Sequence, residues 1–411
     1  MRRLLLTSNA LSGGGTERVA YTHGKIFARL ADFEVAVLTC ERRAGYPPEM
    51  GIKQYILPDF RQVSKIRGVL DHNFNKKAMA EILEDFAPDV IHIHAYVNFG
   101  IGAARALAEY KSKSGCRVIM THHGYAHFCP NDYFFNYRTN QLCEKCMKNN
   151  KNSGNHGFRL LLDNCASNPA VSAGKYLQKR GFRKIFSERL ADVHVTPCEF
   201  SREKFSRCEP EFDVRLIRNP CLETVSDKMP DKISGKMVYF GRISREKNVA
   251  AAAEAVLRLK SSRVRLTIIG SGPDEHELNK ILSGQSNSEI SFINEFMPKA
   301  RLHRAVSDAE YFILPSVWYE VAPVSMIEAI NLGMTPIVSN HGGMKEIAER
   351  AGIGYMFDPK DIGSIAAAIE QAAANRKADE KKLEGGVARD FLKMHTEQTY
   401  EEKLIDIYSS F

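Results

Sequence analysis

The strongest constraint on the fold of this chain is a repeated alternation of short apolar runs with longer amphipathic stretches along its 411 residues. The apolar runs are rich in Val, Ile and Leu and have the length of strands, whereas the stretches between them have the length of helices. Such alternation is typical of parallel sheets covered on both faces. The runs expected to be strands are RRLLLTSNA, FEVAVLTC, PDVIHIHAY, CRVIMTHHG, MVYFGRIS, VRLTIIG, EISFINEF, EYFILPS and TPIVSN.

The segment 216–236 interrupts this alternation with Pro, Gly, Ser and mixed charges, and is therefore expected to be a linker. It divides the chain into residues 1–215 and 216–390. We predict two Rossmann-like, doubly wound parallel-sheet domains that face each other across a cleft, with ligands at the carboxyl ends of the strands. A hydride-transferring dinucleotide enzyme would share this α/β architecture, but neither SGGGTE nor IIGSGPDE has the G-x-G-x-x-G spacing.

Charge is distributed unevenly along the chain. Residues 1–215 hold 32 Lys+Arg and 22 Asp+Glu, a net charge of +10, whereas the remaining residues have a net charge of −2. A basic first half suits an anionic partner, either nucleic acid or an anionic membrane surface or phospholipid-linked substrate. The cluster 61–77 mixes basic and apolar residues, which fits a membrane-facing segment and fits a solvated charged face equally well.

No signal peptide or membrane span is evident in the sequence, so a soluble, cytoplasmic protein is expected. The three leucines near the N-terminus are too short for a signal peptide, and no run approaches the roughly 20 apolar residues of a membrane span. The nine cysteines are an odd number and unevenly spread, which fits reduced thiols better than a disulfide framework.

Two loops that follow strands could hold phosphate. SGGGTE places the amides of Gly14 and Gly15 in front of a helix, where backbone N–H groups favour an anion, although such loops also make simple tight turns. GRISREKN places Arg242 and Lys247 after the first strand of the second half. Two cations there would neutralise a diphosphate, although either one alone could merely solvate a loop.

The segment WYEVAPVSMIEAI carries a carboxylate near each end. Pro323 suits the first turn of a helix, so Glu320 is expected in the preceding loop and Glu328 about one and a half turns inside. The amides of Val324 and Ser325 lie at the positive helix end, which attracts negative charge. A nucleotide-sugar along this helix would place its diphosphate at that end, with Glu320 accepting hydrogen bonds from sugar hydroxyls and Glu328 from the ribose.

In combination these motifs resemble family 4 of the retaining glycosyltransferases, which have the GT-B fold. The resemblance covers essentially the whole chain and rests on Glu320-x7-Glu328 together with PSVWYE, TPIVSN, HGGMKEI, GRISREKN, IIGSGPDEHEL, PDVIHIH, SGGGTE and TEQTYEEKLIDIY. It implies a nucleotide-sugar donor, such as a UDP- or GDP-sugar, bound by residues 216–390 and an acceptor bound by residues 1–215. It also implies that a last helix, about 391–411, crosses back onto the first domain.

The resemblance further implies roles for the residues singled out above. Arg242 and Lys247 would hold the diphosphate, Glu320 the sugar and Glu328 the ribose. The chain would transfer the sugar to a saccharide or lipid-linked acceptor in bacterial polysaccharide or glycan assembly, in the cytoplasm or at the inner face of the cytoplasmic membrane, and would not bind nucleic acid. The sequence lacks an Asp-x-Asp pair, so no metal cofactor is expected for catalysis.

The chain departs from the family pattern at two places. Ala322-Pro323 stand where many members have a glycine, and Asn219-Pro220 stand where an Asn-Gly is common. These departures leave the donor sugar open. A nucleotide-sugar epimerase or phosphorylase of the same fold, or a non-catalytic scaffold that binds nucleotide-sugars, are the alternative interpretations.

Histidines and cysteines complete the candidate residues of the first half. His94 ends a strand, and the resemblance makes it a catalytic contact to the sugar or acceptor, whereas a structural histidine is the alternative and His92 is expected to be structural. The segment MTHHGYAHFCP resembles that of a subset of the family, and this resemblance makes His123 the acceptor-side candidate, although Gly124 and Ala126 depart from the subset. The insertion at about 129–168 holds Cys129, Cys143, Cys146 and Cys165, a pattern that predicts a structural zinc site, with an iron–sulfur site or unligated thiols as the alternatives.

Overall fold

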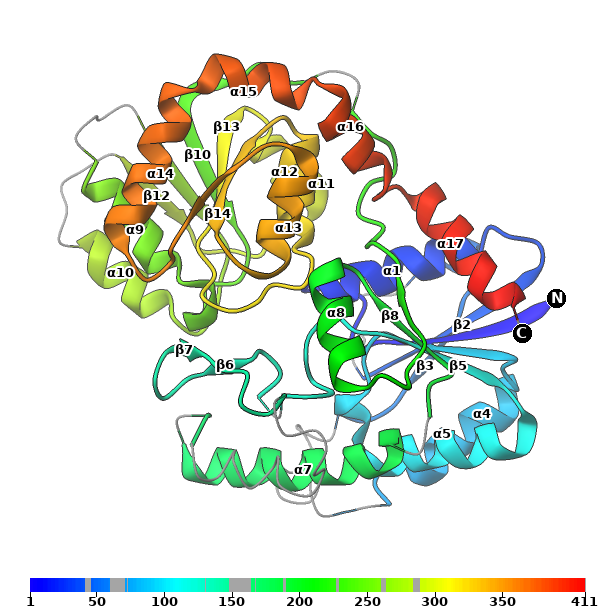
Figure 1. Cartoon of the computed structure of the whole chain (residues 1–411). Coiled ribbons are helices and arrows are strands. Elements are labelled where there is room, and N and C mark those ends of the chain that lie inside the picture. The colour runs from blue at the N-terminus through cyan, green and yellow to red at the C-terminus, as the bar shows by residue number, and fades with distance from the viewer. Residues whose placement is uncertain are drawn as a thin grey trace. The chain divides into compact units, whose positions relative to one another are not determined.

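The computed structural model of the protein describes residues 1–40, 46–59, 71, 73–129, 131–147, 164–166, 168–187, 190–226, 229–259, 264–283 and 289–410. The chain forms two compact units, one of Met1–Pro220 with Glu397–Phe411 and the other of Cys221–Thr396 (Figure 1). The expected linker begins at residue 216, and the units divide between Pro220 and Cys221.

A seven-stranded parallel sheet in the order β3-β2-β1-β4-β5-β8-β9 forms the centre of the first unit. Its strands are β1 Arg2–Thr7, β2 Phe33–Thr39, β3 Lys53–Ile56, β4 Val90–Ile93, β5 Arg117–Thr121, β8 Val193–Thr196 and β9 Val214–Leu216. The helices are α1 Gly15–Phe27, α4 Lys76–Phe86, α5 Gly100–Ser114, α7 Pro169–Ser187, α8 Glu199–Cys208 and α17 Glu397–Ser409. A small antiparallel hairpin of β6 Phe135–Asn136 and β7 Gln141–Leu142 lies within the predicted insertion.

Both faces of this sheet are buried, because alternate residues of each strand enter different apolar cores. Leu5 of β1 packs in one core with residues of α4, α5 and α7, among them Met79 and Leu107. Leu4 and Leu6 pack in the other core with residues of α1 and α17. The continuous apolar runs in the sequence reflect this two-sided burial.

The last helix, α17, is part of the first unit, where Tyr400, Leu404, Ile407 and Tyr408 are buried in the core beside α1. It is shorter than the sequence suggested, because residues 386–393 form a separate helix in the second unit. Between the two helices the carbonyl of His395 accepts hydrogen bonds from the amides of Cys221 and Leu222.

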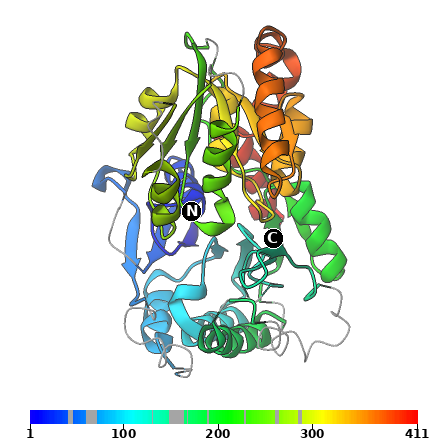
Figure 2. The ribbon, with the colours of Figure 1, turned by 90° about the vertical axis from the view of Figure 1, so that its left-hand side faces the viewer.

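A six-stranded parallel sheet in the order β12-β11-β10-β13-β14-β15 forms the centre of the second unit. Helix α9 contacts α10 and α14, and helix α16 contacts α12 and α13, and the two groups cover opposite faces of the sheet (Figures 1 and 2). The strands are β10 Ile233–Phe240, β11 Arg265–Ile269, β12 Ile290–Ile293, β13 Ala309–Leu314, β14 Thr335–Ser339 and β15 Tyr355–Phe357. The helices are α9 Val249–Leu257, α10 Glu275–Ser283, α11 Lys299–Val306, α12 Val324–Asn331, α13 Gly342–Ala351, α14 Ile362–Ala374, α15 Arg376–Leu383 and α16 Gly386–Lys393.

Each sheet has one position where the strand order reverses. In the first unit it lies between β1 and β4, and in the second unit between β10 and β13. Ligands of doubly wound sheets bind outside the carboxyl ends of the strands at such a switch point. The topology therefore predicts ligand-binding sites at the loops after Thr7, Ile93, Phe240 and Leu314.

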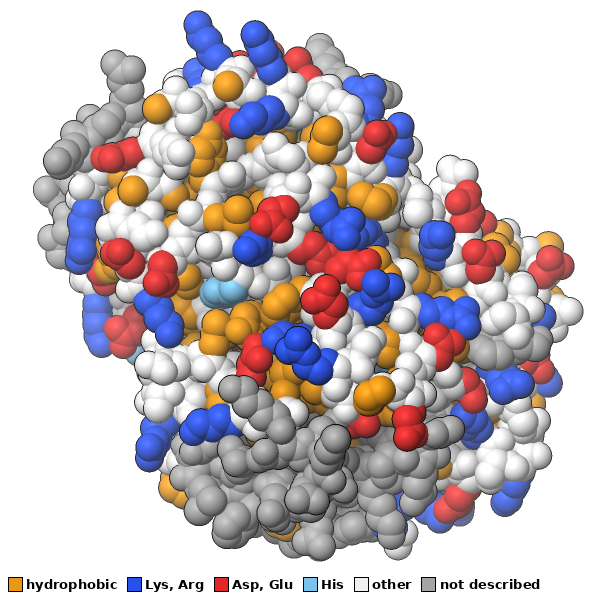
Figure 3. All heavy atoms as spheres, in the orientation of Figure 1, with side chains coloured by type: hydrophobic (Ala, Val, Ile, Leu, Met, Phe, Trp, Pro, Cys, Tyr) orange, Lys and Arg blue, Asp and Glu red, His pale blue; other side chains and the backbone are white. Residues whose placement is uncertain are grey.

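Contact with a membrane surface stays a prediction. No helix within the described residues is long and apolar enough to cross a membrane. Among the described residues seen in Figure 3, basic and acidic side chains are interspersed. Most of the basic and apolar cluster at 61–77 lies outside the described residues.

Candidate active site

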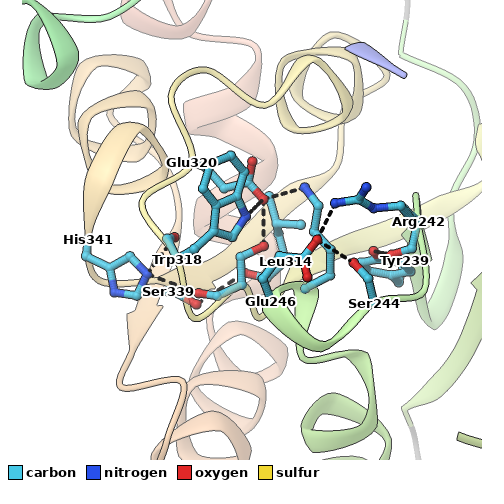
Figure 4. Close-up of polar contacts among 11 residues, drawn as sticks. Tyr239, Arg242, Ser244, Glu246, Leu314, Trp318, Glu320, Ser339 and His341 are labelled. Carbon is cyan, nitrogen blue, oxygen red and sulfur yellow. Dashed lines mark hydrogen bonds and ion pairs between the residues drawn. The ribbon is translucent and has the colours of Figure 1, made fainter. Parts of the chain in front are cut away.

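The switch point of the second unit brings Lys247 and Glu320 together. Lys247 follows β10 in a short turn, and its ammonium group donates a hydrogen bond to Oε1 of Glu320, in the loop after β13. The hydroxyl of Ser316 and the indole N–H of Trp318 donate to the same oxygen, at 2.7 and 2.9 Å (Figure 4). Glu320 is buried, so these donors compensate for the loss of hydration of its carboxylate. Its second oxygen, Oε2, accepts none of the three bonds.

Arg242 lies in the same turn but pairs with a carboxylate for which the motifs predicted no role. Its guanidinium group donates to Oε1 of Glu246, which also accepts a bond of 2.8 Å from the hydroxyl of Ser244 (Figure 4). The carbonyl of Glu246 accepts a hydrogen bond from the amide of Val317, 2.9 Å away. Glu246 thus positions Arg242 and also fastens the turn after β10 to the loop that carries Glu320.

His341 is a second residue of the site for which no role was predicted from the sequence. Its Nε2 lies 3.0 Å from the carbonyl of Ser316 and 3.1 Å from that of Trp318. Because both partners are acceptors, Nε2 must carry the proton and donate to both. Burial lowers the pKa of His341, although the two carbonyls oppose this shift. The neutral ring therefore fixes the conformation of the loop 316–318, in which the side chains of Ser316 and Trp318 both donate to Glu320. The HGGMKEI motif signalled this position.

The two glycines after His341 allow α13 to approach the same loop. The amide of Gly343 donates to the carbonyl of Glu320 at 2.7 Å. A Cβ atom at Gly343 would lie 1.9 Å from the carbonyl oxygen of Val321, which no side chain can tolerate. Gly342 has φ +62°, in the left-handed region that favours glycine. The motif is thus required by the close contact of two backbones.

The helix after Glu320 begins one residue later than predicted. Pro323 is the N-cap residue, with φ −67° and ψ 109°, and α12 starts at Val324. The amides of Val324 and Ser325 are in its first turn, where N–H groups have no partner within the helix. Glu328 is fully buried on this helix, with its Oε1 3.8 Å from Lys299 Nζ and 3.5 Å from His303 Nε2.

The switch point of the first unit brings together the two predicted histidines, His94 and His123. Their Nδ1 and Nε2 atoms, respectively, lie 2.9 Å apart. The amide of His94 donates to the carbonyl of Thr7, which places the residue directly after β4 and beside β1. The Nε2 of His94 lies 2.9 Å from Nδ1 of His23, so both of its ring nitrogens are occupied within the chain. A sugar hydroxyl could bond to a His94 nitrogen only by replacing one of these partners.

Burial keeps these imidazoles neutral near pH 7. It lowers the pKa values of His23, His92 and His94 and lowers that of His123 to about 4. Neighbouring histidines lower the first three further, because a second positive charge in the cluster would be repelled. The group can therefore accept or donate hydrogen bonds to a hydroxyl without carrying charge.

The predicted anion site at Gly14 and Gly15 contains a carboxylate of the chain itself. Gly14 is the N-cap of α1, and its amide donates to Oε2 of Glu17 at 3.1 Å. Glu17 therefore takes the place at the helix end that a phosphate would take. Phosphate binding by this loop stays a prediction.

The four cysteines of the insertion form no disulfide with one another, and Cys129 is buried while the others are half-buried. Backbone hydrogen bonds gather the segments around the β6–β7 hairpin: the amide of Cys143 donates to Phe134, and the carbonyl of Cys165 accepts from Tyr137. The potential metal ligands that lie within 4.8 Å of one another in the described part of the chain are His23, His92 and His94. Zinc at the cysteines stays a prediction.

Two family models match the chain in succession. The model described as Glycosyltransferase Family 4 matches residues 13–221, and that described as Glycosyl transferases group 1 matches residues 228–385.

Two relatives that match part of the chain are glycosyltransferases or synthases by name. The putative colanic acid biosynthesis glycosyltransferase WcaL of Salmonella typhimurium is 26% identical over 161 residues, which cover 38% of this chain and 39% of the relative. The alpha-maltose-1-phosphate synthase of Mycolicibacterium smegmatis is 27% identical over 223 residues, which cover 48% of this chain and 57% of the relative. The chain thus matches less than two thirds of the length of either relative.

Solved structures match the whole chain. HepE of Anabaena, in complex with UDP and glucose, has a TM-score of 0.67 at 11% identity, with 100% of both chains covered. The sucrose-phosphate synthase of Thermosynechococcus elongatus has a TM-score of 0.69 at 15% identity, with 100% of this chain and 99% of that chain covered. The GT-B fold predicted from the sequence is therefore confirmed.

Proposed function

The chain belongs to glycosyltransferase family 4, and from this premise we propose that it transfers a sugar from a nucleotide-sugar to a saccharide or lipid-linked acceptor with retention of configuration. The observation that carries the proposal is the convergence of Lys247, Ser316 and Trp318 on one oxygen of Glu320 at the switch point of the second unit. This arrangement fixes a carboxylate and a cation where a doubly wound sheet binds its ligand.

The second unit is proposed to bind the donor. Its diphosphate would lie against the ammonium of Lys247, the guanidinium of Arg242 and the amides of Val324 and Ser325, where two cations and a helix N-terminus favour negative charge. Both cations pair with carboxylates of the chain, so the diphosphate would compete with Glu246 and Glu320 for them. Glu328 would accept hydrogen bonds from the ribose hydroxyls. For this, its contacts with Lys299 and His303 of α11 would have to shift, or Glu328 would have to contact α11 and the ribose together.

Glu320 is proposed to hold the transferred sugar. The donors around it occupy Oε1, which leaves Oε2 to accept a bond from a sugar hydroxyl. When the bond from the sugar to the diphosphate breaks, the released phosphate oxygen takes the proton of the attacking acceptor hydroxyl on the same face of the sugar. Lys247, Arg242 and the helix end stabilise the charge that develops on the leaving group, so this step needs no metal ion.

The first unit is proposed to bind the acceptor, with His123 as the contacting residue and His94 as its hydrogen-bonded support. UDP is the favoured donor nucleotide, because solved structures of the same fold contain UDP or UDP-glucose, with a GDP-sugar as the alternative. The likeness to WcaL favours assembly of a bacterial surface polysaccharide. Such an acceptor is built in the cytoplasm or at the inner face of the cytoplasmic membrane, which would suit the basic first half.

The test begins with binding of UDP-, GDP- and ADP-sugars, measured as a rise in melting temperature. The sugar that binds is then incubated with saccharide acceptors, and products are identified by mass spectrometry and by the anomeric configuration in NMR spectra. Glu320→Gln is expected to lower kcat by about 10²–10³-fold, as when one preorganised polar group is lost. Glu277→Gln, on an exposed part of α10, is the matched control and should leave activity unchanged.

Two results would contradict the proposal. If no nucleotide-sugar raised the melting temperature, the donor site would be assigned wrongly. If an epimerised or hydrolysed sugar formed without any acceptor, at the rate of the full reaction, the protein would be an epimerase or hydrolase of the same fold.

A further inference from the structure

A chain of hydrogen bonds joins His123 to the last helix through the interior of the first unit. His123 Nε2 lies 2.9 Å from His94 Nδ1, and His94 Nε2 lies 2.9 Å from His23 Nδ1. His23 Nε2 then lies 3.0 Å from the hydroxyl of Tyr408 on α17, which in turn lies 2.6 Å from His92 Nδ1. All of these side chains are buried except His123, which is half-buried. The chain therefore runs from a partly exposed ring to the core.

Two further hydroxyl groups form hydrogen bonds with the histidines of this network. His92 Nε2 lies 2.7 Å from Oγ1 of Thr121, and the hydroxyl of Tyr400 lies 3.3 Å from His23 Nδ1. The remaining ring nitrogen of the chain is Nδ1 of His123, for which no partner is found among the described residues. His123 is the partly exposed side chain of the network, so it is the residue at which a ligand can contact the network.

The positions of the protons along the chain are coupled. A neutral imidazole has one N–H, so each ring donates with one nitrogen and accepts with the other. The hydroxyl of Tyr408 has one proton, so it donates to one of His23 and His92 and accepts from the other. If it donates to His92, then His23 carries its proton on Nε2, His94 on Nε2 and His123 on Nε2. If it donates to His23, every ring carries its proton on Nδ1.

Bond lengths favour the first arrangement. A hydroxyl donor gives shorter bonds than an N–H donor, and the bond of Tyr408 to His92 is 2.6 Å while that to His23 is 3.0 Å. In this arrangement Nδ1 of His123 has a free lone pair.

A metal ion explains the cluster less well. The ligand atoms of His23, His92 and His94 lie within 4.8 Å of one another. However, both nitrogens of each ring already have hydrogen-bond partners at 2.6–3.0 Å. An ion would have to break several of these bonds in a core that lacks a charged ligand among these three residues.

We propose that Tyr408 is a positioning residue which, through His23 and His94, holds His123 in the tautomer whose Nδ1 accepts a hydrogen bond from a hydroxyl of the sugar acceptor. The inference rests on the proposed function for its ligand, while the tautomer is a property of the protein alone. It gives the last helix a part in the chemistry of the acceptor site in addition to its packing.

The test uses full-length protein labelled with ¹⁵N-histidine, in which long-range ¹H–¹⁵N spectra at pH 7.5 distinguish protonated from unprotonated ring nitrogens. His94→Gln and His123→Gln assign the signals. In the wild type, Nδ1 of His123 should be unprotonated and Nε2 protonated. Tyr408→Phe keeps the ring but removes the hydroxyl, so the signals of His94 and His123 should shift toward an average of the two tautomers. Tyr400→Phe removes only the longer bond and should shift them less.

The kinetic readout is the KM for the acceptor, which Tyr408→Phe should raise about tenfold, the equivalent of one hydrogen bond, with little change in kcat. If this variant fails to fold, Thr121→Val removes the hydroxyl at the other end of the chain and should give the same spectral change. Unchanged histidine spectra in the folded variants would overturn the inference. So would stoichiometric zinc binding by the metal-free protein with loss of these histidine signals. Altered spectra in a protein without transferase activity would overturn the proposed function and leave the tautomer control standing.

Discussion

The ammonium of Lys247 and the carboxylate of Glu320 form an ion pair although 73 residues separate them in the chain. Both are well shielded from solvent, since their side chains are 18% and 6% exposed. The pair joins the turn after β10 to the loop after β13, the two neighbouring strands at the switch point. Lys247, expected to bind phosphate, and Glu320, expected to bind the sugar, thus fix each other's side chains in position.

This pairing predicts a strong energetic coupling. Lys247→Met leaves the Glu320 carboxylate buried with two neutral donors, and should lower the free energy of unfolding by about 3 kcal/mol. Glu320→Gln and the double variant complete the cycle, and the two effects should fall short of additivity by at least about 1 kcal/mol. Urea denaturation gives the values.

The matched control is Lys280→Met, because Lys280 pairs with Glu277 at 3.3 Å but both side chains are more than half exposed. This change should cost less than about 1 kcal/mol. Additive effects of the two Lys247–Glu320 changes would show that the pair contributes nothing to stability.

The close contact at Gly343 predicts that a single methyl group disrupts the donor site. Gly343→Ala would place its Cβ 1.9 Å from the carbonyl oxygen of Val321, so α13 and the Glu320 loop must separate. Nucleotide-sugar affinity should fall at least about tenfold, the effect of a loss of about 1.4 kcal/mol. Isothermal titration calorimetry measures the affinity.

Gly386→Ala provides the comparison, because a Cβ there would meet nothing within 4 Å. It should leave affinity unchanged and should stabilise the protein by a few tenths of a kcal/mol, up to about 1 kcal/mol, by restricting the unfolded chain. Equal affinities in the two variants would contradict the role assigned to the Gly343 contact.

The sequence was sufficient to predict the fold because both sheets are buried on both faces. Short runs such as LLL in β1 and VIHI in β4 are buried throughout, as is typical of a strand between two layers of helices, and they could therefore be predicted as strands. The sites followed from the same logic, since residues directly after a parallel strand lie at its carboxyl end. Strand order along the sequence was therefore enough to place Arg242, Lys247 and Glu320 at that edge of the sheet.

Contacts among loop side chains could not be predicted in the same way. Glu246 reads as one more charge in SREKN, and only the turn geometry shows it as the partner of Arg242. His341 follows a strand, but its bonds to two carbonyls depend on the shape of a loop 25 residues earlier. The histidine network joins residues 23, 94, 123 and 408, whose proximity is a result of sheet order and of α17 packing against the first unit.

The insertion predicts a bound metal. Protein purified without chelators should contain about one zinc per chain, because four thiolates can bind zinc tetrahedrally and so stabilise the segment that carries them. Cys143→Ser should abolish zinc binding, measured by inductively coupled plasma mass spectrometry. Cys221→Ser, at a buried cysteine of the second unit, should retain the metal. Zinc-free wild-type protein would mean that the cysteines are unligated thiols.

Buried neutral histidines predict that the protein loses stability in mild acid. The pKa values of His194 and His123 are lowered to about 4, mainly by burial, and those of five further histidines are lowered as well, namely His23, His92, His94, His122 and His341. Because the folded pKa values lie below the unfolded value near 6.5, the unfolded chain binds more protons between about pH 4 and 6.5. Stability is therefore complete above pH 6.5 and falls as the pH decreases, by up to about 1.4 kcal/mol per pH unit for each such histidine.

Urea denaturation from pH 5 to pH 8 measures this dependence. His122 and His194 form a separate pair, with Nε2 and Nδ1 2.8 Å apart, outside the network that reaches Tyr408. Replacing both by glutamine removes two titrating groups, so the slope of unfolding free energy against pH below 6.5 should decrease. A flat slope in the wild type would contradict this prediction, because it would mean that the histidines bind protons in the folded protein as readily as in the unfolded chain. The hydrogen bonds between the rings argue against this, since two protonated imidazoles can only donate and could not bond to each other.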